Sequence, residues 1–254
     1  DVATTRTLLH EAIPVTGTIV SGTYEDENIK YFASGMFASV YDYPFLSSSA
    51  NHIFDITAGY FSGTFGAPGT KEADVQHQKK INIYNQFAQV LVPYDVNGNI
   101  QQFDQDGDIA GGGNKISSAF FISFGRLLAK DEIKKGSFRF DMYTTSPDGA
   151  SASNERTGLQ TIGDYGAATT FKQNSPTGEY GLLYTSSADI NNESAVGHIY
   201  YQAGVAVITS SIFQNATPTM TTASVMSTIT TSSVGDLFIS GTIDECANAI
   251  RYAY

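Results

Sequence analysis

The sequence predicts an α+β fold that is predominantly antiparallel β, a sheet or sandwich, with one mid-chain helix and one C-terminal helix. Charged residues make up only 15% of the 254 residues, below the roughly 25% usual for soluble domains, while Gly, Ser, Thr and Tyr are abundant. Apolar and polar residues alternate most cleanly over residues 137–144, as in a half-buried strand. Two similar segments, 178–187 and 198–211, each carry a Tyr-rich apolar run to a Thr-Ser stop, which predicts strand, loop, strand.

The first three apolar runs are also predicted to be strands, because β-branched or aromatic residues are mixed in them with small polar ones. They cover residues 13–22, 31–41 and 51–65, and an acidic turn at 25–27 separates the first two. A helix is expected next, near residues 71–92. Glycine disappears there, and apolar residues follow helix-like intervals at Val75, Ile83, Phe87, Val90 and Leu91.

Pro93 fits the end of this helix. The polar, Gly-rich residues 95–114 are expected to form a loop, with room for a short hairpin at Asn97-Gly98. Residues 118–128 form a continuous apolar run whose length favours a buried strand over the start of a helix.

Residues 148–166 are predicted to be loop because Gly, Asn and Ser dominate them. The terminal segment 241–254 is predicted to be a helix. Thr242 is a suitable N-cap, and Asp244 and Glu245 would lie in the first turn, where negative charge is favourable.

The length suits a single structural domain covering residues 1–254, which can bury roughly three quarters of its extended surface. Residues 1–30 and the Thr/Ser-rich tract 217–233 are candidates for extended segments. The single cysteine, Cys246, excludes an internal disulfide, and no Cys/His spacing indicates zinc. Asp1 in place of Met leaves open whether a leader was removed or the chain continues upstream.

Charge and hydropathy argue against two classes of partner. The net charge of −11 and the pI near 4.6 repel phosphates, and the basic pairs at 79–80 and 134–135 are isolated, so we expect no nucleic acid partner. No apolar run reaches the 18 or so residues of a membrane-spanning helix, and no signal segment is recognisable. We therefore expect no membrane partner either.

Three aspartates alternate along the loop after Phe103 and suggest an oxygen-lined calcium site: Asp104, Asp106 and Asp108. Their spacing departs from an EF-hand, since Gly107 stands fourth rather than sixth and Lys115 stands twelfth, where a bidentate Glu is needed. A loop starting at Asp95 has Ile100 at its sixth position and fits no better. We predict a solvated turn here and no metal site.

No catalytic pattern emerges from the other polar residues. The four histidines are far apart in sequence: His10, His52, His77 and His198. No nucleophile-elbow, phosphate-loop, dinucleotide or zinc-protease motif is present. Carboxylate pairs such as Asp26 with Asp55 could serve glycoside hydrolysis, but nothing selects one pair among 25 acidic residues, and there is no Trp for sugar stacking. We expect no catalytic residue, no cofactor and no enzymatic activity.

Tyrosine is the remaining distinctive residue type, with 15 copies. It favours protein interfaces because it buries much area and keeps a hydroxyl for a partner, but it also fills half-exposed strand faces. Both interpretations stay open for the tyrosines of the paired segments and the C-terminus: Tyr180, Tyr184, Tyr200, Tyr201, Tyr252 and Tyr254.

Several stretches in order along residues 32–213 carry a resemblance to virion structural proteins of contractile-tailed bacteriophages, especially cyanophages: residues 49–57, 79–95, 120–138, 174–187 and 197–211. The resemblance implies an assembly role in the virion, in the tail or baseplate, with the neck or capsid surface as other locations. It implies other copies of the chain and neighbouring virion proteins as partners, with assembly in the host cytoplasm. The alternatives are a receptor- or glycan-binding module and a cell-wall hydrolase.

Overall fold

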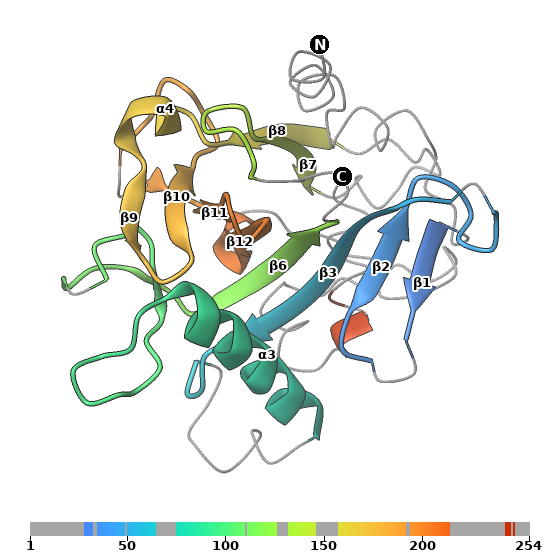
Figure 1. Cartoon of the computed structure of the whole chain (residues 1–254), viewed down its shortest axis with the longest axis horizontal. Helices are drawn as coiled ribbons and strands as arrows, with labels where there is room; N and C mark the ends of the chain where they lie inside the picture. The colour runs from blue at the N-terminus through green and yellow to red at the C-terminus, as the bar shows by residue number, and fades with distance from the viewer. Residues whose placement is uncertain are drawn as a thin grey trace.

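A computed structural model describes residues 28–32, 35–48, 50–64, 75–109, 111–125, 132–145, 157–191, 194–213, 242–244 and 246. Its main element is an eight-stranded sheet, antiparallel at every pairing, in the order β1-β2-β3-β6-β12-β11-β10-β9 (Figure 1). The strands are β1 (Ile29–Tyr31), β2 (Ala38–Tyr41), β3 (His52–Tyr60), β6 (Ser118–Phe124), β9 (Lys172–Ser175), β10 (Gly178–Leu183), β11 (Gly197–Tyr200) and β12 (Val205–Thr209). The predicted α+β, predominantly antiparallel fold is confirmed.

The centre of the sheet is the pairing of β3 with β6, which runs from Phe54 opposite Phe124 to Tyr60 opposite Ser118. Alternate side chains of β6 enter two different cores: Phe120 and Ile122 pack on one face, and Phe121 packs on the other. A strand covered on both faces has an almost continuous apolar sequence, as residues 118–124 do.

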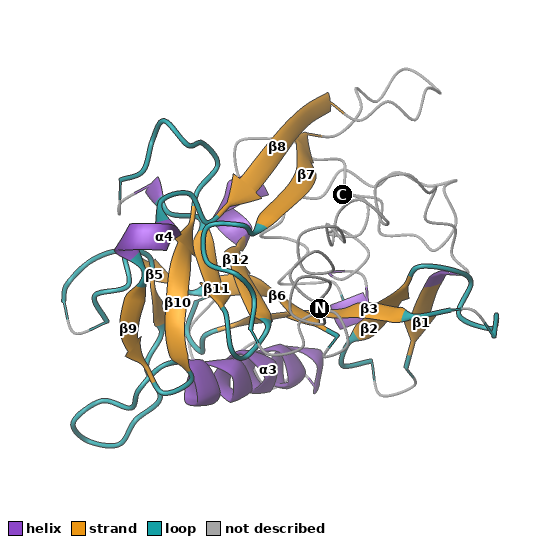
Figure 2. Cartoon of the chain, turned by 45° about the horizontal axis from the view of Figure 1, so that its top comes forward, coloured by secondary structure: helices purple, strands orange, loops and turns teal. Residues whose placement is uncertain are grey.

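Separate elements cover the two faces (Figure 2). A hairpin of β7 (Arg139–Thr145) and β8 (Thr157–Gly163) contributes Phe138, Phe140 and Ile162 to the core around Phe120. On the opposite face lie helix α3 (Val75–Leu91) and a small hairpin of β4 (Phe103–Asp104) and β5 (Lys115–Ile116). Two short helices complete the described structure, α4 (Ala167–Thr170) and the 3-10 helix η3 (Ser210–Phe213).

Helix α3 packs tightly on β3 because a glycine allows the two backbones to approach. A Cβ atom on Gly59 would lie 2.5 Å from the carbonyl oxygen of Lys80 and 2.8 Å from the backbone nitrogen of Tyr84. Tyr84 is fully buried under this contact, and its hydroxyl donates a 2.5 Å hydrogen bond to the carbonyl of Ile116. The helix therefore joins the sheet to the β4–β5 hairpin.

Three element predictions need correction. The run at 31–41 is two strands, because the chain turns at Gly35, which has a φ of +57°. The segment 198–211 is likewise split into β11 and β12 by a turn at residues 201–204. The segment 148–166, expected to be loop, contains β8, which pairs with β7 although its own sequence is weakly apolar.

Other predictions are confirmed with shifted ends, namely the strands at 51–65, 118–128 and 137–144 and the mid-chain helix. Asn97-Gly98 forms a turn in which Asp95 and Asn99 are hydrogen-bonded, with no strand on either side. At the C-terminus, the amide of Cys246 donates to the carbonyl of Thr242, a helical bond. The strand expected at 13–22, the tract 217–233 and the other terminal residues lie outside the described residues.

None of the described helices combines the length and the apolar character needed to cross a bilayer.

Candidate functional site

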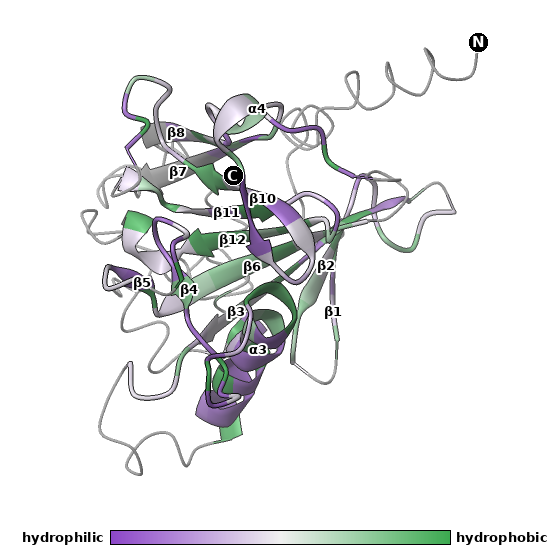
Figure 3. Ribbon diagram, turned by 60° about the vertical axis from the view of Figure 1, so that its left-hand side comes forward, coloured by the Kyte–Doolittle hydropathy of each residue, from purple (hydrophilic) through white to green (hydrophobic). Residues whose placement is uncertain are grey.

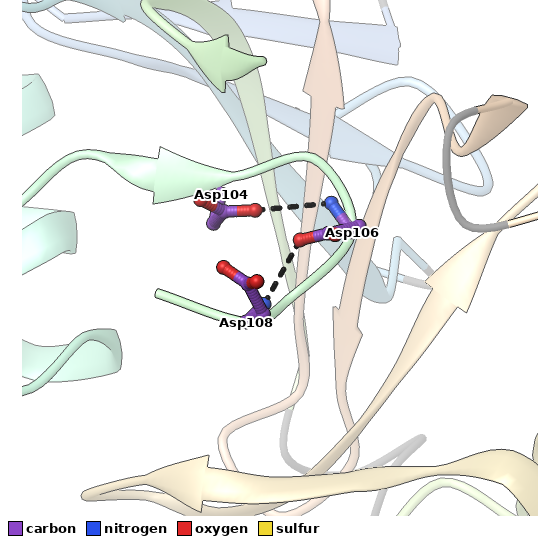
Figure 4. Close-up of side chains that lie close together, drawn as sticks. All are labelled: Asp104, Asp106 and Asp108. Atoms are coloured by element: carbon purple, nitrogen blue, oxygen red, sulfur yellow. Dashed lines mark hydrogen bonds between the residues drawn. The ribbon is translucent and has the colours of Figure 1, made fainter. Parts of the chain in front are cut away.

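The three aspartates do come together in space, in the turn that follows β4. Each of Asp104, Asp106 and Asp108 places a carboxylate oxygen within 4.8 Å of the others (Figure 4). Their carboxylates accept backbone hydrogen bonds from further along the turn. The amide of Asp106 donates to Asp104 at 3.2 Å, and the amide of Asp108 donates to Asp106 at 3.0 Å. These are Asx-type turns, which such residues form readily.

Lys115 places a positive charge in this turn. The ammonium of Lys115 on β5 donates to the buried carboxylate of Asp104 and lies near two backbone oxygens, at 3.4 Å from Ile109 and 3.2 Å from Gly111. Antiparallel pairing of Asp104 with Lys115 places the two side chains together. Sequence reasoning noted Lys115 only as a mismatch to a calcium loop; the structure places its positive charge among the oxygens.

The charge on Asp104 is favoured despite burial. Burial raises the pKa of this carboxyl, but its interactions with Asp106 and Lys115 outweigh that effect and leave the pKa below its ordinary value. Ile109, in the same turn, has a φ of +33°, a left-handed conformation that costs an L-residue on the order of 1 kcal/mol. The turn is thus closed by the ion pair of Asp104 with Lys115, which sets one ammonium against three carboxylates.

Below the turn lies a layer of buried aromatic and polar side chains. The hydroxyl of Tyr180 is 2.7 Å from the side-chain oxygen of Asn174 and 3.2 Å from the carbonyl of Gly107. Asn174 also donates to Gly107 at 2.8 Å. A Cβ atom on Gly107 would lie 2.9 Å from the Tyr180 hydroxyl, so glycine permits this close contact. These bonds hold the acidic turn against β9 and β10.

His198 lies in the same layer, on β11, and is only 1% exposed. Its Nδ1 atom is 3.3 Å from the Tyr200 hydroxyl, while the buried Nε2 has no hydrogen-bond partner among the described residues. Burial lowers the pKa of His198 to about 4. The imidazole is therefore neutral at pH 7 and contributes to packing beneath the turn.

The other histidines belong to separate sites. His52 and Ser39 both bind the same oxygen of Asp55, at 2.8 and 2.5 Å. A nucleophilic triad needs the imidazole between the serine and the carboxylate, so this order does not match one. His77 pairs with Tyr60 at 2.5 Å. His10 and Asp26 lie outside the described part of the chain.

A second polar cluster was missed by sequence reasoning. Asp164 is fully buried and accepts three hydrogen bonds: from the amide of Gly136 at 2.6 Å, the hydroxyl of Tyr201 at 2.9 Å and the guanidinium of Arg139 at 3.1 Å. Burial is the largest influence on its pKa and raises it above the ordinary value, against these bonds. The cluster links the β7–β8 hairpin to the main sheet, and only the pairing of distant segments could reveal it.

The tyrosines of the paired strands are buried inside this chain. Tyr180, Tyr184, Tyr200 and Tyr201 are each 4% exposed or less, and Tyr180 stacks on Tyr200 with ring centres 4.9 Å apart. They fill the protein's own core and offer little surface to a partner. Tyr252 and Tyr254 lie outside the described residues.

A groove of about 670 Å³ lies at the C-terminal end of α3. Its apolar walls come from the helix and from the start of β12 and the turn before it: Phe87, Val90, Leu91, Ala203 and Val205. The rest of the lining is polar but uncharged: Gln86, Thr177 and Gln202. No charged side chain is among these eight lining residues.

Turns at the end of the sheet hold the groove in shape. The Ser175 hydroxyl donates to the last helical carbonyl, that of Leu91, at 2.6 Å, and so ties the β9–β10 turn to the helix. Gly178, with a φ of +96°, forms a bulge after this turn. Phe87 is stacked flat on Phe121 of β6, at 4.3 Å between ring centres.

Val90 stands at the rim of this groove and is 57% exposed. Tyr94 and Val96, in the loop after the helix, are also exposed. Together with the groove, these exposed apolar side chains make this end of α3 a candidate contact surface.

Comparisons of this chain with protein-family models, curated proteins and solved structures find no match. The groove and the acidic turn are therefore interpreted from their own geometry and chemistry.

Proposed function

We propose that this chain is a non-enzymatic structural component of a bacteriophage virion, of the tail or baseplate, and that it acts through contacts between subunits. The phage assignment rests on the resemblance of the segments between residues 32 and 213. The mode of action rests on the groove at the end of α3.

The groove carries the proposal because it is apolar and uncharged in a chain whose net charge is −11. Burying such a surface against a neighbour removes apolar area from water without the cost of desolvating a charge. Val90 at the rim contributes an aliphatic side chain that would gain from being covered.

The buried tyrosines do not add to this argument. Their rings are already covered by the chain's own strands and helix, so contacts with other subunits would have to use different side chains. This shifts the expected contact surface from the strands of the sheet to the helix end and its groove.

Quantitative mass spectrometry of purified particles tests the proposal directly. The particles should come from the phage that encodes the chain, and immunogold labelling with antibodies against the recombinant protein should then locate it. We expect many copies per particle and labels grouped on the tail or its base. A chain that is missing from washed particles, or that turns over host wall material in a zymogram, would overturn the proposal.

A further inference from the structure

We propose that Asn97 is a site of spontaneous covalent modification, at which the chain converts a side-chain amide into a carboxylate through a cyclic imide. The inference goes beyond the proposed function and does not depend on it, because it rests on the chemistry of the turn that follows α3. Water is the only other reactant.

A glycine directly follows Asn97, and the two form the single Asn-Gly pair among the 254 residues. Closure of the imide ring requires the backbone nitrogen of the next residue to reach the Cγ atom of the asparagine. A side chain on that next residue would crowd the approach, whereas glycine has no Cβ atom. A Cβ atom placed on Gly98 would meet nothing within 4 Å, so no neighbouring element obstructs this peptide either.

The side chain of Asn97 is free to rotate into the reactive position. Asn97 is exposed, and its carboxamide has no hydrogen-bond partner within the described part of the chain. Three other asparagines each donate from the side-chain amide to a fixed acceptor: Asn51 to Asp42 at 2.8 Å, Asn99 to Asp95 at 2.9 Å and Asn174 to Gly107 at 2.8 Å. These bonds restrict the rotation that ring closure requires.

One backbone hydrogen bond opposes the reaction. The amide of Gly98 donates to the carbonyl of Asp95 at 3.0 Å, and the amide of Asn97 donates to the Asp95 carboxylate at 2.8 Å. The Gly98 nitrogen has to leave this bond before it can attack. Residues 96–99 are exposed and belong to no strand, and segments of this kind open locally at little cost in free energy.

The reaction releases ammonia and takes up water. The Gly98 nitrogen loses its proton to a solvent base and attacks Cγ of Asn97. A new C–N bond forms, the bond from Cγ to the side-chain nitrogen breaks, and that nitrogen leaves as ammonia with a proton from solvent. Water then opens the five-membered imide at either carbonyl, which gives aspartate or isoaspartate at position 97.

Both products change the turn. Each adds one negative charge to a chain whose net charge is −11. Isoaspartate also lengthens the main chain between Asp95 and Gly98 by a methylene group, so the Gly98 amide no longer fits the Asp95 carbonyl. The Gln101 side chain donates to the carbonyl of Pro93 at 3.0 Å and closes the base of this loop, so we expect the change to stay within it.

Mass spectrometry of the purified full chain, kept at neutral and at mildly alkaline pH, tests the site. We expect a gain of about 1 Da as the amide becomes an acid, with release of an equal amount of ammonia. The reaction should be faster at alkaline pH, where the Gly98 nitrogen loses its proton more readily. Proteolytic mapping should place the products at position 97, formed at least about tenfold faster than at Asn51, Asn99 or Asn174.

Asn97→Gln is the matched control, because it keeps an amide at this position but requires a larger ring. The variant should keep its mass under the same conditions. Isoaspartyl methyltransferase, which methylates isoaspartate, should label the aged parent protein and not the aged variant. Circular dichroism should show the same fold for both proteins, because the substituted side chain is exposed.

Two outcomes would overturn the inference. Conversion at position 97 no faster than at Asn51 would show that the Asn-Gly pair has no special reactivity in this fold. A native chain that stays unmodified, while a synthetic peptide of residues 92–101 is converted, would show that the bonds to Asp95 protect the turn. Neither outcome bears on the virion role, which the particle analysis decides.

Discussion

The ammonium of Lys115 is hydrogen-bonded to the carboxylate of Asp104, across the second of the two residue pairs that join β4 to β5. Asp104 is 1% exposed, whereas the Lys115 side chain is 30% exposed. The pair therefore lies at the boundary of the core, with the aspartate inside and the lysine closing the turn from the solvent side.

Lys115→Met should destabilise the protein by about 1–3 kcal/mol, because it leaves the buried Asp104 carboxylate without its cation. The pKa of Asp104 is lowered in the folded state, so its contribution is present at neutral pH and is lost as the pH falls through the folded value. Urea unfolding at several pH values should show a shallower acid dependence in the variant. Lys134→Met, at an exposed lysine, is the control; an equal loss there would show that the effect is nonspecific.

Calcium at millimolar concentration should leave the melting temperature unchanged. Of the three grouped carboxylates, the buried one on Asp104 already binds the Lys115 ammonium, which also lies near the backbone oxygens of Ile109 and Gly111. Differential scanning calorimetry with calcium and with a chelator provides the measurement. A rise of several degrees with calcium would mean that the ion displaces the lysine.

His198 should make the protein sensitive to acid between about pH 6.5 and pH 4. Its folded pKa is lowered to about 4, so the stability it contributes is complete above its unfolded pKa and falls as the imidazole becomes charged in the unfolded chain. The total loss is about 3 kcal/mol. His198→Phe should flatten the stability profile in this range, whereas His52→Gln, at a half-exposed histidine, should preserve it.

Gly59→Ala should destabilise the protein by about 1–3 kcal/mol, because the new methyl group would overlap the backbone of α3. Gly113→Ala is the matched control, since a Cβ atom there meets nothing within 4 Å. Thermal unfolding of both variants provides the comparison. Equal melting temperatures would contradict the close approach of α3 and β3.

Asp164→Ala should cost about 3 kcal/mol, because the Tyr201 hydroxyl and the Arg139 guanidinium lose their shared acceptor. The pKa of Asp164 is raised in the folded state, so ionised Asp164 lowers stability relative to the protonated form, and its contribution improves as the pH falls through the folded value. A double-mutant cycle with Tyr201→Phe should give a coupling of about 1 kcal/mol or more. Asp189→Ala, at an exposed aspartate, should be close to neutral.

Local pattern was sufficient for much of the secondary structure. The run at 118–124 and the alternation around Phe140 are properties of short segments, and both correspond to strands. The helix α3 could likewise be predicted from the spacing of its own apolar residues. Figure 3 shows hydrophilic and hydrophobic positions along its ribbon, beside the mainly hydrophobic strands β6 and β12. Strand β8 was missed because its sequence is weakly apolar and its pairing with β7 stabilises it.

Side-chain partners depend on which distant segments meet, and periodicity contains no information about that. The alternation of Asp104, Asp106 and Asp108 was visible in the chain, but the ammonium that pairs with Asp104 could be assigned only after β4 paired with β5. The tyrosines of β10 and β11 could be recognised as strand residues, while their burial follows from the cover that α3 and the β4–β5 hairpin provide. Secondary structure follows from the hydropathy pattern of a few neighbouring residues, so the sequence alone predicts much of it. Side-chain burial and charge pairing arise from contacts between distant segments, so only the tertiary structure determines them.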